Sequence, residues 1–179
     1  MHNIEQVYND MSVCYDNVYV DGEDNVYLRD ERIAAEWYKK IVRSGRIVSL
    51  GCGTGQDVSI LDYPTDFTGY DISDGMLKSA KKKFPNLEFK HSNCMLPIDD
   101  QCDILVSIFG TPNYIGAYSL LKHYKRMNAK HAFFVFYNEH YTDGVIETYH
   151  RYTRKELIEI FNCEVHDLEA NSNYYVVQW

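Results

Sequence analysis

The chain alternates short apolar runs with amphipathic stretches, which predicts β-strands that alternate with α-helices. Two near-continuous apolar runs, Asp103–Phe109 and His131–Tyr137, are typical of strands buried on both faces of a sheet. Three shorter strand-like runs precede them: Arg46–Leu50, Phe67–Asp71 and Leu87–Phe89.

Helix signals fall between these runs. Residues Tyr27–Ser44 keep their apolar positions at a spacing near 3.6, and Gly45 supplies a stop after them. Further helices are predicted from the glycine-rich turn as far as Pro64, from Ser73 to Pro85, over Ile115–Met127, and over Leu157–Phe161 behind a capping box of Thr153 and Glu156.

The chain ends in two strand-like pieces, Cys163–Leu168 and Tyr174–Val177, whose connection suits an antiparallel hairpin. The alternating elements before that hairpin predict a doubly wound, Rossmann-like α/β sheet, mostly parallel, with helices on both faces. Ligands of such sheets bind at the carboxyl ends of the strands. Five segments should therefore carry the chemistry: Gly51–Gly55, Asp71–Ser73, Asn93–Cys94, Ser107–Tyr114 and Asn138–Tyr141.

The stretch Ile47–Asp57 is the most informative part of the chain. Its apolar run enters three glycines at alternate positions, Gly51, Gly53 and Gly55, and a helix can begin directly after them. A glycine turn between a buried strand and a helix lets the backbone approach a ligand closely, with free N–H groups at the helix start. The turn therefore predicts a nucleotide site, provided that neighbouring segments supply the other residues that such a site needs.

Asp71 is the first of those neighbours. It ends the second strand, twenty positions after Gly51, which is the spacing at which an acid holds the hydroxyls of a ribose. The alternative is a simple turn residue that opens the helix at Ser73. The glycines read G-x-G-x-G, whereas a dinucleotide turn reads G-x-G-x-x-G, so an NAD-dependent oxidoreductase is disfavoured.

At these residues the sequence resembles the class I S-adenosylmethionine-dependent methyltransferases, and the resemblance extends from Tyr8 to Trp179. Leu50–Gly55 matches the first motif of that family, and Tyr70–Ser73 looks like its second. The resemblance implies a sheet of about seven strands with only the last inserted strand antiparallel. It also implies S-adenosylmethionine (SAM) as cofactor and S-adenosylhomocysteine (SAH) as product.

The resemblance further implies which residues hold the cofactor. Asp71 would take the ribose, Ile72 would pack near the adenine, and Asn93 would meet the adenine amino group. The complete predicted set is Tyr15, Gly51, Cys52, Gly53, Gly55, Asp71, Ile72, Met76, Asn93, Cys94 and Ser107.

Two positions depart from the family pattern. The family usually carries an acid two places before the first glycine, commonly near the methionine end of the cofactor, and this chain has Ser49 there. It usually also carries an acid after the third strand, where this chain has Asn93 or, counted back from Leu96, Ser92. The Asn93 carbonyl can accept the same hydrogen bond. These departures favour the main alternative function, an inactive SAM- or SAH-binding scaffold.

The segment 1–25 contains Tyr8-Asn9 and Tyr15-Asp16, which resemble the repeat that small-molecule methyltransferases fold over the cofactor as a lid. The other interpretation is that these tyrosines only cover the first helix. Methyl transfer depends on orientation and desolvation, and it needs a base only where the nucleophile arrives protonated. Candidates for that base are Tyr15, Tyr114 and His140.

Two further patterns concern the acceptor. Thr111–Tyr114, Thr-Pro-Asn-Tyr, is a distant echo of the Asn/Asp/Ser-Pro-Pro-Tyr/Phe motif of enzymes that methylate nitrogen in bases or glutamine. It lacks the second proline and begins several residues late, so a nucleic-acid or protein acceptor is disfavoured. Arg151 or Arg154 can contact an anionic substrate, although ordinary charges at a helix start explain both equally well.

Composition narrows these interpretations. With 179 residues the chain fits one domain, 1–179, whose residues 1–25 form the expected lid. The net charge of −8 argues against non-specific nucleic-acid binding. The five cysteines form no Cys-x-x-Cys pair, which indicates reduced thiols and no metal site. No apolar run approaches a membrane span and no signal pattern opens the chain, so we expect a cytoplasmic protein.

Together these observations predict a SAM-dependent methyltransferase that acts on a small molecule, because the chain has no room for a separate substrate domain. They leave the acceptor, the methylated atom and the oligomeric state open.

Overall fold

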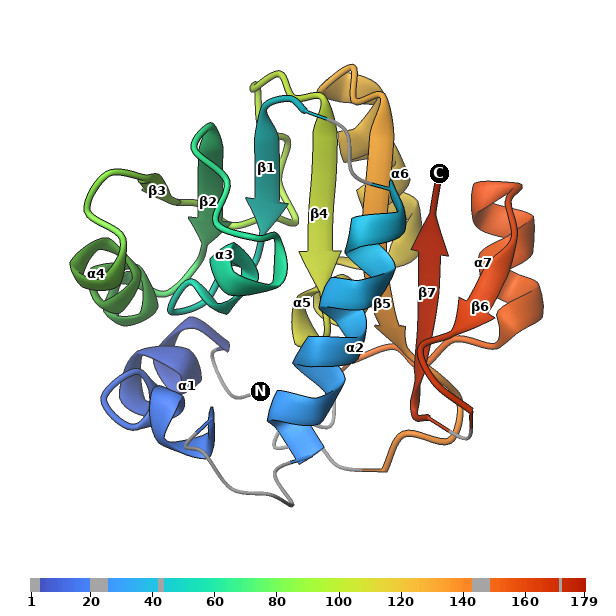
Figure 1. Ribbon diagram of the computed structural model, residues 1–179, viewed down its shortest axis with the longest axis horizontal. Helices are drawn as coiled ribbons and strands as arrows, with labels where there is room; N and C mark the ends of the chain where they lie inside the picture. Colours follow the sequence, from blue (N-terminus) through green and yellow to red (C-terminus); the bar gives the residue numbers. More distant parts are fainter. Residues whose placement is uncertain (1–3, 20–25, 42–43, 143–148, 171) are drawn as a thin grey trace.

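A single mixed sheet forms the centre of the computed structural model, which describes residues 4–19, 26–41, 44–142, 149–170 and 172–179 (Figure 1). Within these residues the strand order is β3-β2-β1-β4-β5-β7-β6. The strands are β1 Ile47–Leu50, β2 Phe67–Asp71, β3 Glu88–His91, β4 Ile104–Ile108, β5 His131–Tyr137, β6 Val165–Asp167 and β7 Tyr174–Gln178.

Helices connect and flank these strands. They are α1 Ile4–Met11, the 3₁₀ helix Tyr15–Tyr19, α2 Val26–Ile41, α3 Gln56–Ile60, α4 Asp74–Lys83, α5 Gly110–Ile115, α6 Ala117–Arg126 and α7 Arg154–Phe161. The capping signals read from the sequence are confirmed at two of them. Ser73 accepts the Met76 N–H at the start of α4, and Thr153 forms a capping box with Glu156 at the start of α7.

The direction of the strands confirms the predicted α/β topology. Strands β3, β2, β1, β4 and β5 are parallel to one another, and β7 pairs antiparallel with both β5 and β6. The chain moves outward from β1 to β3, then returns to place β4 on the other side of β1. This reversal puts the topological switch point at the carboxyl ends of β1 and β4, where such sheets bind their ligands.

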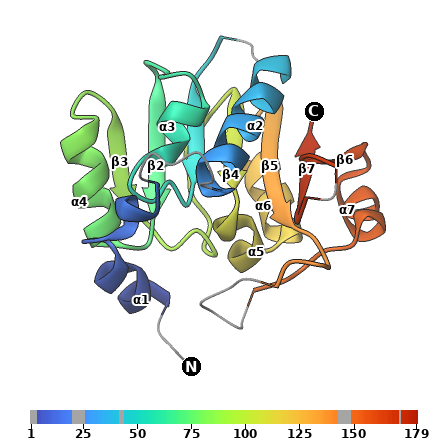
Figure 2. The same ribbon diagram turned by 60° about the horizontal axis from the view of Figure 1, so that its bottom comes forward.

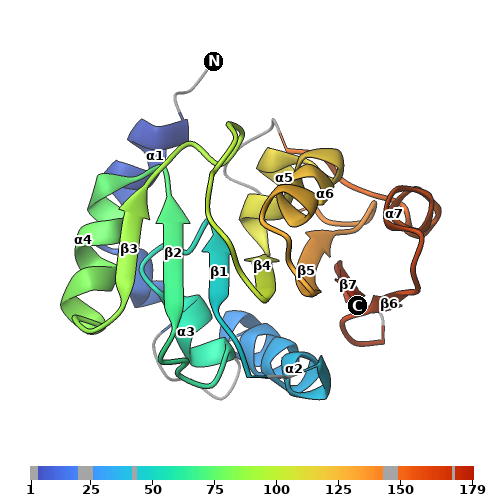
Figure 3. The same ribbon diagram turned by 90° about the horizontal axis from the view of Figure 1, so that it is seen from above.

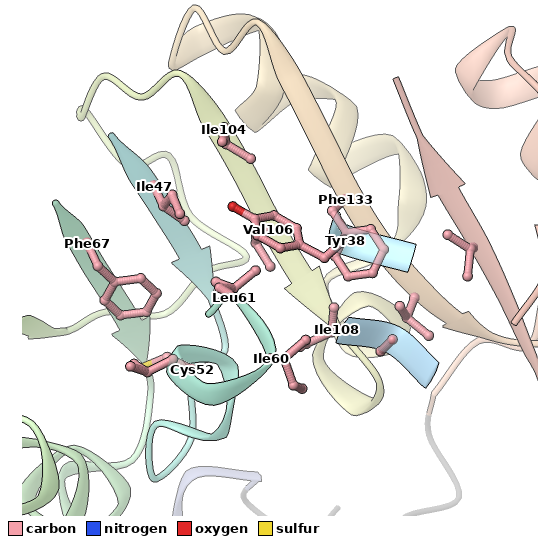
Figure 4. Close-up of a cluster of buried hydrophobic side chains, with 14 of the residues drawn as sticks. Tyr38, Ile47, Cys52, Ile60, Leu61, Phe67, Ile104, Val106, Ile108 and Phe133 are labelled. Atoms are coloured by element: carbon pink, nitrogen blue, oxygen red, sulfur yellow. The ribbon is translucent and has the colours of Figure 1, made fainter. Parts of the chain in front are cut away.

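Two hydrophobic cores cover the two faces of the sheet. The view from above shows α2 and α3 on one side of the strands and α5 and α6 on the other (Figure 3). Helices α2, α3 and α4 pack on one face, and α5, α6 and α7 pack on the other. In the first core, Tyr38 of α2 lies against Phe133 of β5 with ring centroids 5.7 Å apart (Figure 4). Successive residues of β5, such as Phe133 and Phe134, face opposite cores. Both faces of the strand are therefore buried, which explains its continuous apolar run.

The structure differs from the sequence prediction at several boundaries. The helix predicted over Ile115–Met127 corresponds to α6, which begins only at Ala117 because Gly116 adopts a φ of 86°. The short helix α5 before Gly116 was not predicted. The N-terminal segment contains α1, which its polar sequence did not predict. The predicted helix Tyr27–Ser44 corresponds to α2, which ends at Ile41, and residues 42–43 lie outside the described part.

Smaller differences concern strands and loops. The predicted strand Cys163–Leu168 is the shorter β6, and the strand predicted at Leu87–Phe89 is β3. Most of the loop predicted over Glu139–Tyr149 falls on residues 143–148, outside the described residues. Within the described chain, no helix combines the length and apolar character of a membrane span.

Replacement of Leu105 by alanine should destabilise the protein by about 2–5 kcal/mol, because the side chain is fully buried in the second core and its loss leaves a cavity. Chemical denaturation measures this change. Leu96→Ala is the control, because Leu96 is 60% exposed and its loss should change the free energy of unfolding by about 0.5 kcal/mol or less. Equal effects of the two substitutions would contradict the packing described above.

Candidate cofactor site

A cavity of about 340 Å³ lies at the carboxyl ends of β1, β2 and β4. Its walls come from the turns after β1, β2, β3 and β4 and from the N-terminal segment. Ten of the thirteen predicted cofactor and base residues line it: Tyr15, Gly51, Cys52, Gly53, Asp71, Ile72, Met76, Asn93, Cys94 and Tyr114. The fold thus brings together segments that are far apart in the sequence, at the edge where the parallel topology predicts a ligand.

The glycine turn forms the floor of this cavity. Gly51 has a φ of 81°, and a Cβ there would stand 1.8 Å from Thr111 Oγ1, so no side chain fits. Gly53 has a φ of 53°, and a Cβ there would meet only Gln56 Oε1, at 3.5 Å. A side chain at Gly53 would therefore project into open space over the turn. The bare backbone leaves that space to a ligand.

Asp71 joins the turn after β1 to the turn after β2. Its carboxylate accepts the Gly53 N–H and the Ser73 N–H, both at 2.9 Å. Burial raises the pKa of Asp71 above its ordinary value, and the backbone hydrogen bonds of Ser73, Gly53 and Ile72 offset this rise only in part. A carboxylate offers about four lone-pair sites, so these backbone donors leave at least one site for another donor. Such an acceptor at the cavity floor has the chemistry that the hydroxyls of a ribose require.

The wall beyond β2 and β3 is mostly apolar. Met76 is 1% exposed and Cys94 is 6% exposed, while Ile72 is half-buried. Burial raises the pKa of the Cys94 thiol to about 12, so this thiol stays protonated. The Asn93 side-chain carbonyl accepts the Met95 N–H at 2.9 Å and retains a second lone pair. This wall suits a flat heterocycle with a hydrogen-bond donor at its edge.

Three predicted site residues lie outside the cavity lining. Gly55 sits behind the turn, where a Cβ would approach the Phe84 ring to 2.9 Å. Ser107 is fully buried and donates a hydrogen bond to the Leu50 carbonyl at 2.8 Å, which ties β4 to β1. The His140 side chain is 78% exposed in the loop after β5. Of these three residues, two support the turn and one faces solvent.

Asp57 lines the cavity and was not singled out from the sequence. It lies in the first turn of α3, is 5% exposed, and accepts a hydrogen bond from the Ser49 hydroxyl. Burial raises the pKa of Asp57 to about 7, the Ser49 hydrogen bond lowers it, and the charge of Asp71 raises it. The sequence did contain a signal for this residue. Asp57 is an acid in the first turn after the glycines, and it falls on the apolar face of a short helix.

Glu31 is a second carboxyl that the sequence did not indicate. It comes from α2, far from the glycine turn in the sequence, and lines the same cavity. Burial raises the pKa of Glu31 to about 7, and the negative charge of Asp57 adds to the rise. These two carboxyls give the helix-covered side of the cavity an acidic character.

In the pairs Tyr8-Asn9 and Tyr15-Asp16 of the N-terminal segment, the polar residue anchors the segment and the tyrosine lines the cavity. Asn9 Oδ1 accepts the Ser73 hydroxyl at 2.8 Å, and α1 lies beside α4 at the end where the parallel strands finish (Figure 2). Asp16 Oδ1 accepts Gln56 Nε2 and Lys83 Nζ, each at 3.1 Å. The polar partner of each pair thus fixes the segment to the turns that form the site.

The tyrosines of these pairs face the cavity. The Tyr8 hydroxyl donates a hydrogen bond to the Tyr114 hydroxyl at 3.3 Å, and the Tyr8 and Tyr15 ring centroids are 6.5 Å apart. Burial raises the pKa of Tyr8 to about 12 and raises the pKa of Tyr114 as well. Both phenols therefore stay protonated at neutral pH and are poor general bases.

Asn113, in the sequence that echoes the nitrogen-methylating motif, has a structural role. It is fully buried, its amide donates to the Phe109 carbonyl at 2.6 Å, and its carbonyl accepts the Tyr137 N–H at 3.0 Å. Both ends of the amide are thus used to join the segments after β4 and β5. Arg154 is similarly engaged, since it bonds to the Val165 carbonyl and to Asp167.

Comparison with known proteins agrees with this geometry. Residues 47–130 match a family model described as a methyltransferase domain. The ubiquinone/menaquinone biosynthesis C-methyltransferase UbiE of Campylobacter jejuni strain 81116 is 29% identical over 142 residues, which cover 71% of this chain and 59% of that protein. The demethylmenaquinone methyltransferase of Chlorobaculum parvum is 30% identical over 135 residues, which cover 70% of this chain and 55% of that protein.

Solved structures agree with the fold over almost the whole chain. Magnesium protoporphyrin IX methyltransferase from Synechocystis PCC 6803 with bound SAH superposes with a TM-score of 0.71 at 13% identity, covering 98% of this chain and 96% of that chain. The DhpI–SAH complex superposes with a TM-score of 0.73 at 15% identity, covering 97% and 92%. The chain has the fold of a class I SAM-dependent methyltransferase. The predicted fold is therefore confirmed, and the match of residues 47–130 to a methyltransferase domain agrees with the predicted family.

The chain spans less than two thirds of the two relatives' lengths, 59% and 55%. Within the described residues, no group of three or more His, Cys, Asp or Glu side chains is arranged to hold a metal ion.

Asp57→Asn should change the pH dependence of folding in the ligand-free protein. The folded pKa of Asp57, about 7, exceeds the ordinary value of 3.8, so the folded state binds this proton more tightly. The resulting stabilisation is present at pH 4 and is lost as the pH rises through 7. Asparagine stays neutral, so the variant should gain stability relative to wild type over that range, by about 1.4 kcal/mol per unit of pKa difference.

Denaturation at a series of pH values measures this gain. Asp62→Asn removes an exposed carboxyl just beyond α3 and serves as the control, which should follow the wild-type curve. Parallel curves for wild type and Asp57→Asn would contradict the burial of the Asp57 carboxyl.

Proposed function

We propose that this protein binds SAM in the cavity and transfers its methyl group to a small-molecule acceptor. The observation that carries this proposal is the Asp71 carboxylate at the end of β2, hydrogen-bonded to the Gly53 N–H and buried beside a bare glycine floor. A nucleoside that lies on Gly51 and Gly53 would bring its ribose hydroxyls to that carboxylate. Hydrogen bonds to a charged acceptor are among the stronger ones in proteins.

The residues of the cavity fit the adenosine part of the cofactor. Asp71 would hold the ribose, and Ile72 and Met76 would cover one face of the adenine with apolar surface. Asn93 and Cys94 would lie at its edge, where the remaining lone pair of the Asn93 carbonyl suits the adenine amino group. When bound, SAM supplies an electrophilic methyl group on a positively charged sulfur.

The protein contributes position and shielding more than proton transfer. The Tyr8 and Tyr114 phenols stay neutral, so they can orient an acceptor by hydrogen bonds without removing its proton. Tyr15 lies against the same space, and His140 lies outside it. An acceptor that already carries a free lone pair or an ionised oxygen or carbon fits this arrangement best, because no base is then needed.

The enclosure of the cavity supports a small acceptor. The N-terminal segment lines one side of the cavity in which SAM would bind, which restricts the access of a macromolecule. The relatives UbiE and demethylmenaquinone methyltransferase are named for small-molecule methylation, which supports the same class. The position that echoes the nitrogen-methylating motif is occupied by the structural Asn113, which weakens the nucleic-acid and protein alternatives.

The N-terminal segment acts in this proposal as a lid held by Asn9 and Asp16. Asp16→Ala removes the acceptor of Gln56 and Lys83, so the lid should open more often and SAH should dissociate about threefold to tenfold faster. Stopped-flow displacement of SAH measures the rate. Asp10→Ala, on the same segment but outside the cavity lining, should leave the rate unchanged. An unchanged rate in Asp16→Ala would contradict a lid.

Transfer of labelled methyl tests the function itself. Wild-type protein is incubated with methyl-labelled SAM and, separately, with a metabolite, an RNA and a protein fraction. The label should appear in the metabolite fraction. Asp71→Asn keeps the side-chain shape but removes the charge, so SAH affinity and transfer should fall by about tenfold or more. Asp74→Asn changes an exposed acid near the same turn and should have little effect.

Three outcomes would overturn parts of the proposal. Label in RNA or protein would contradict a small acceptor. Tight SAH binding without transfer to any fraction would favour the inactive scaffold. Absence of SAH binding in the wild type would contradict the cofactor assignment.

A further inference from the structure

The position of Asp57 at the cavity is determined by β1 and α3 together. Ser49 lies on β1 two residues before Gly51, is fully buried, and donates its hydroxyl hydrogen bond to Asp57 Oδ2. The carboxyl comes from the first turn of α3, above the strand. Because it also lines the cavity, Asp57 presents a fixed acceptor group to a ligand that rests on the glycine turn.

The fold sets the direction in which such a ligand lies. Asp71, Ile72 and Asn93 belong to the ends of β2 and β3, on one side of β1. A nucleoside placed against them must extend the rest of the molecule across the glycine turn, toward β1 and β4. Asp57 of α3 and Glu31 of α2 line the cavity near that side. The amino-acid end of the cofactor, which carries a protonated amine, would point there.

Charge supports the same orientation. Four carboxyl residues line the cavity, and none of its described lining residues is Lys, Arg or His. The four are Glu5, Glu31, Asp57 and Asp71. A buried carboxylate without a cation costs free energy, which is the reason that the pKa of Asp57 rises to about 7. A ligand ammonium at this place removes that cost, because it supplies the missing opposite charge.

We propose that the Asp57 carboxylate binds the α-ammonium of the cofactor's amino-acid end, and that the Ser49 hydroxyl holds this carboxylate in place. A serine at position 49 has no charge of its own to offer an ammonium, but it can orient the acid of the neighbouring helix. Asp57 thus becomes a binding residue of the site, distinct in task from Asp71, which faces the ribose. This inference rests on the proposed cofactor function.

Two ligands distinguish the contributions that the two ends of the cofactor make to binding. SAH and 5′-methylthioadenosine share the adenosine and a neutral sulfur, but only SAH carries the ammonium and carboxylate. Titration calorimetry should show that Asp57→Asn lowers the affinity for SAH by about tenfold to a hundredfold, which is the effect of losing a hydrogen bond to a charged group. The affinity for 5′-methylthioadenosine should change by less than about threefold, because its bound part does not reach Asp57.

Two further variants complete the design. Ser49→Ala removes only the orienting hydroxyl, so it should lower the affinity for SAH by about threefold to tenfold. The affinity for 5′-methylthioadenosine should stay unchanged. Asp62→Asn, the exposed control near the same helix, should bind both ligands like wild type. Circular dichroism and the melting temperature establish that each variant is folded before its affinities are compared.

The outcomes are distinguishable. If Asp57→Asn and Ser49→Ala leave SAH binding unchanged, or weaken SAH and 5′-methylthioadenosine equally, the role of Asp57 is wrong while the cofactor assignment stands. If the wild type binds neither ligand, the proposed function itself is wrong. Selective loss of SAH in both variants supports the inference.

Discussion

One carboxylate, that of Asp71, holds the site together. It receives backbone N–H groups from Gly53 after β1 and from Ser73 after β2, so the ends of two parallel strands share a single acceptor. Tyr70 strengthens the same junction, because its carbonyl accepts the N–H groups of Gly51 and Cys52 at 2.7 and 3.0 Å. The glycine turn therefore keeps its shape before any ligand arrives, and little ordering cost remains for binding.

The rest of the site is built around this junction. Thr111 from the segment after β4 occupies the place that a Gly51 side chain would need, and Asn9 fixes the N-terminal segment to Ser73. The lining that results is acidic and rich in neutral phenols. That combination suits a positively charged cofactor, and it gives an acceptor hydrogen-bond partners without a strong base.

Much of this arrangement could be predicted from the sequence, because it depends on local patterns. The strand before Gly51, the glycine spacing and the position of Asp71 are all short-range signals, and they led to the correct fold and to the family whose model matches residues 47–130. Asp57, Glu31 and helix α1 could not be predicted in the same way. Their roles depend on which distant strand or helix packs against them, and a polar sequence such as Ile4–Met11 becomes helical only where α4 and the turns receive it.

A crystal structure of the protein with SAH bound is the most direct test of the proposed site. The ribose hydroxyl oxygens should lie about 2.5–3.0 Å from the Asp71 carboxylate oxygens, with the ligand amine directed toward Asp57 and away from β3. A ribose held by other side chains, or a nucleoside bound outside the cavity over Gly51 and Gly53, would contradict this site.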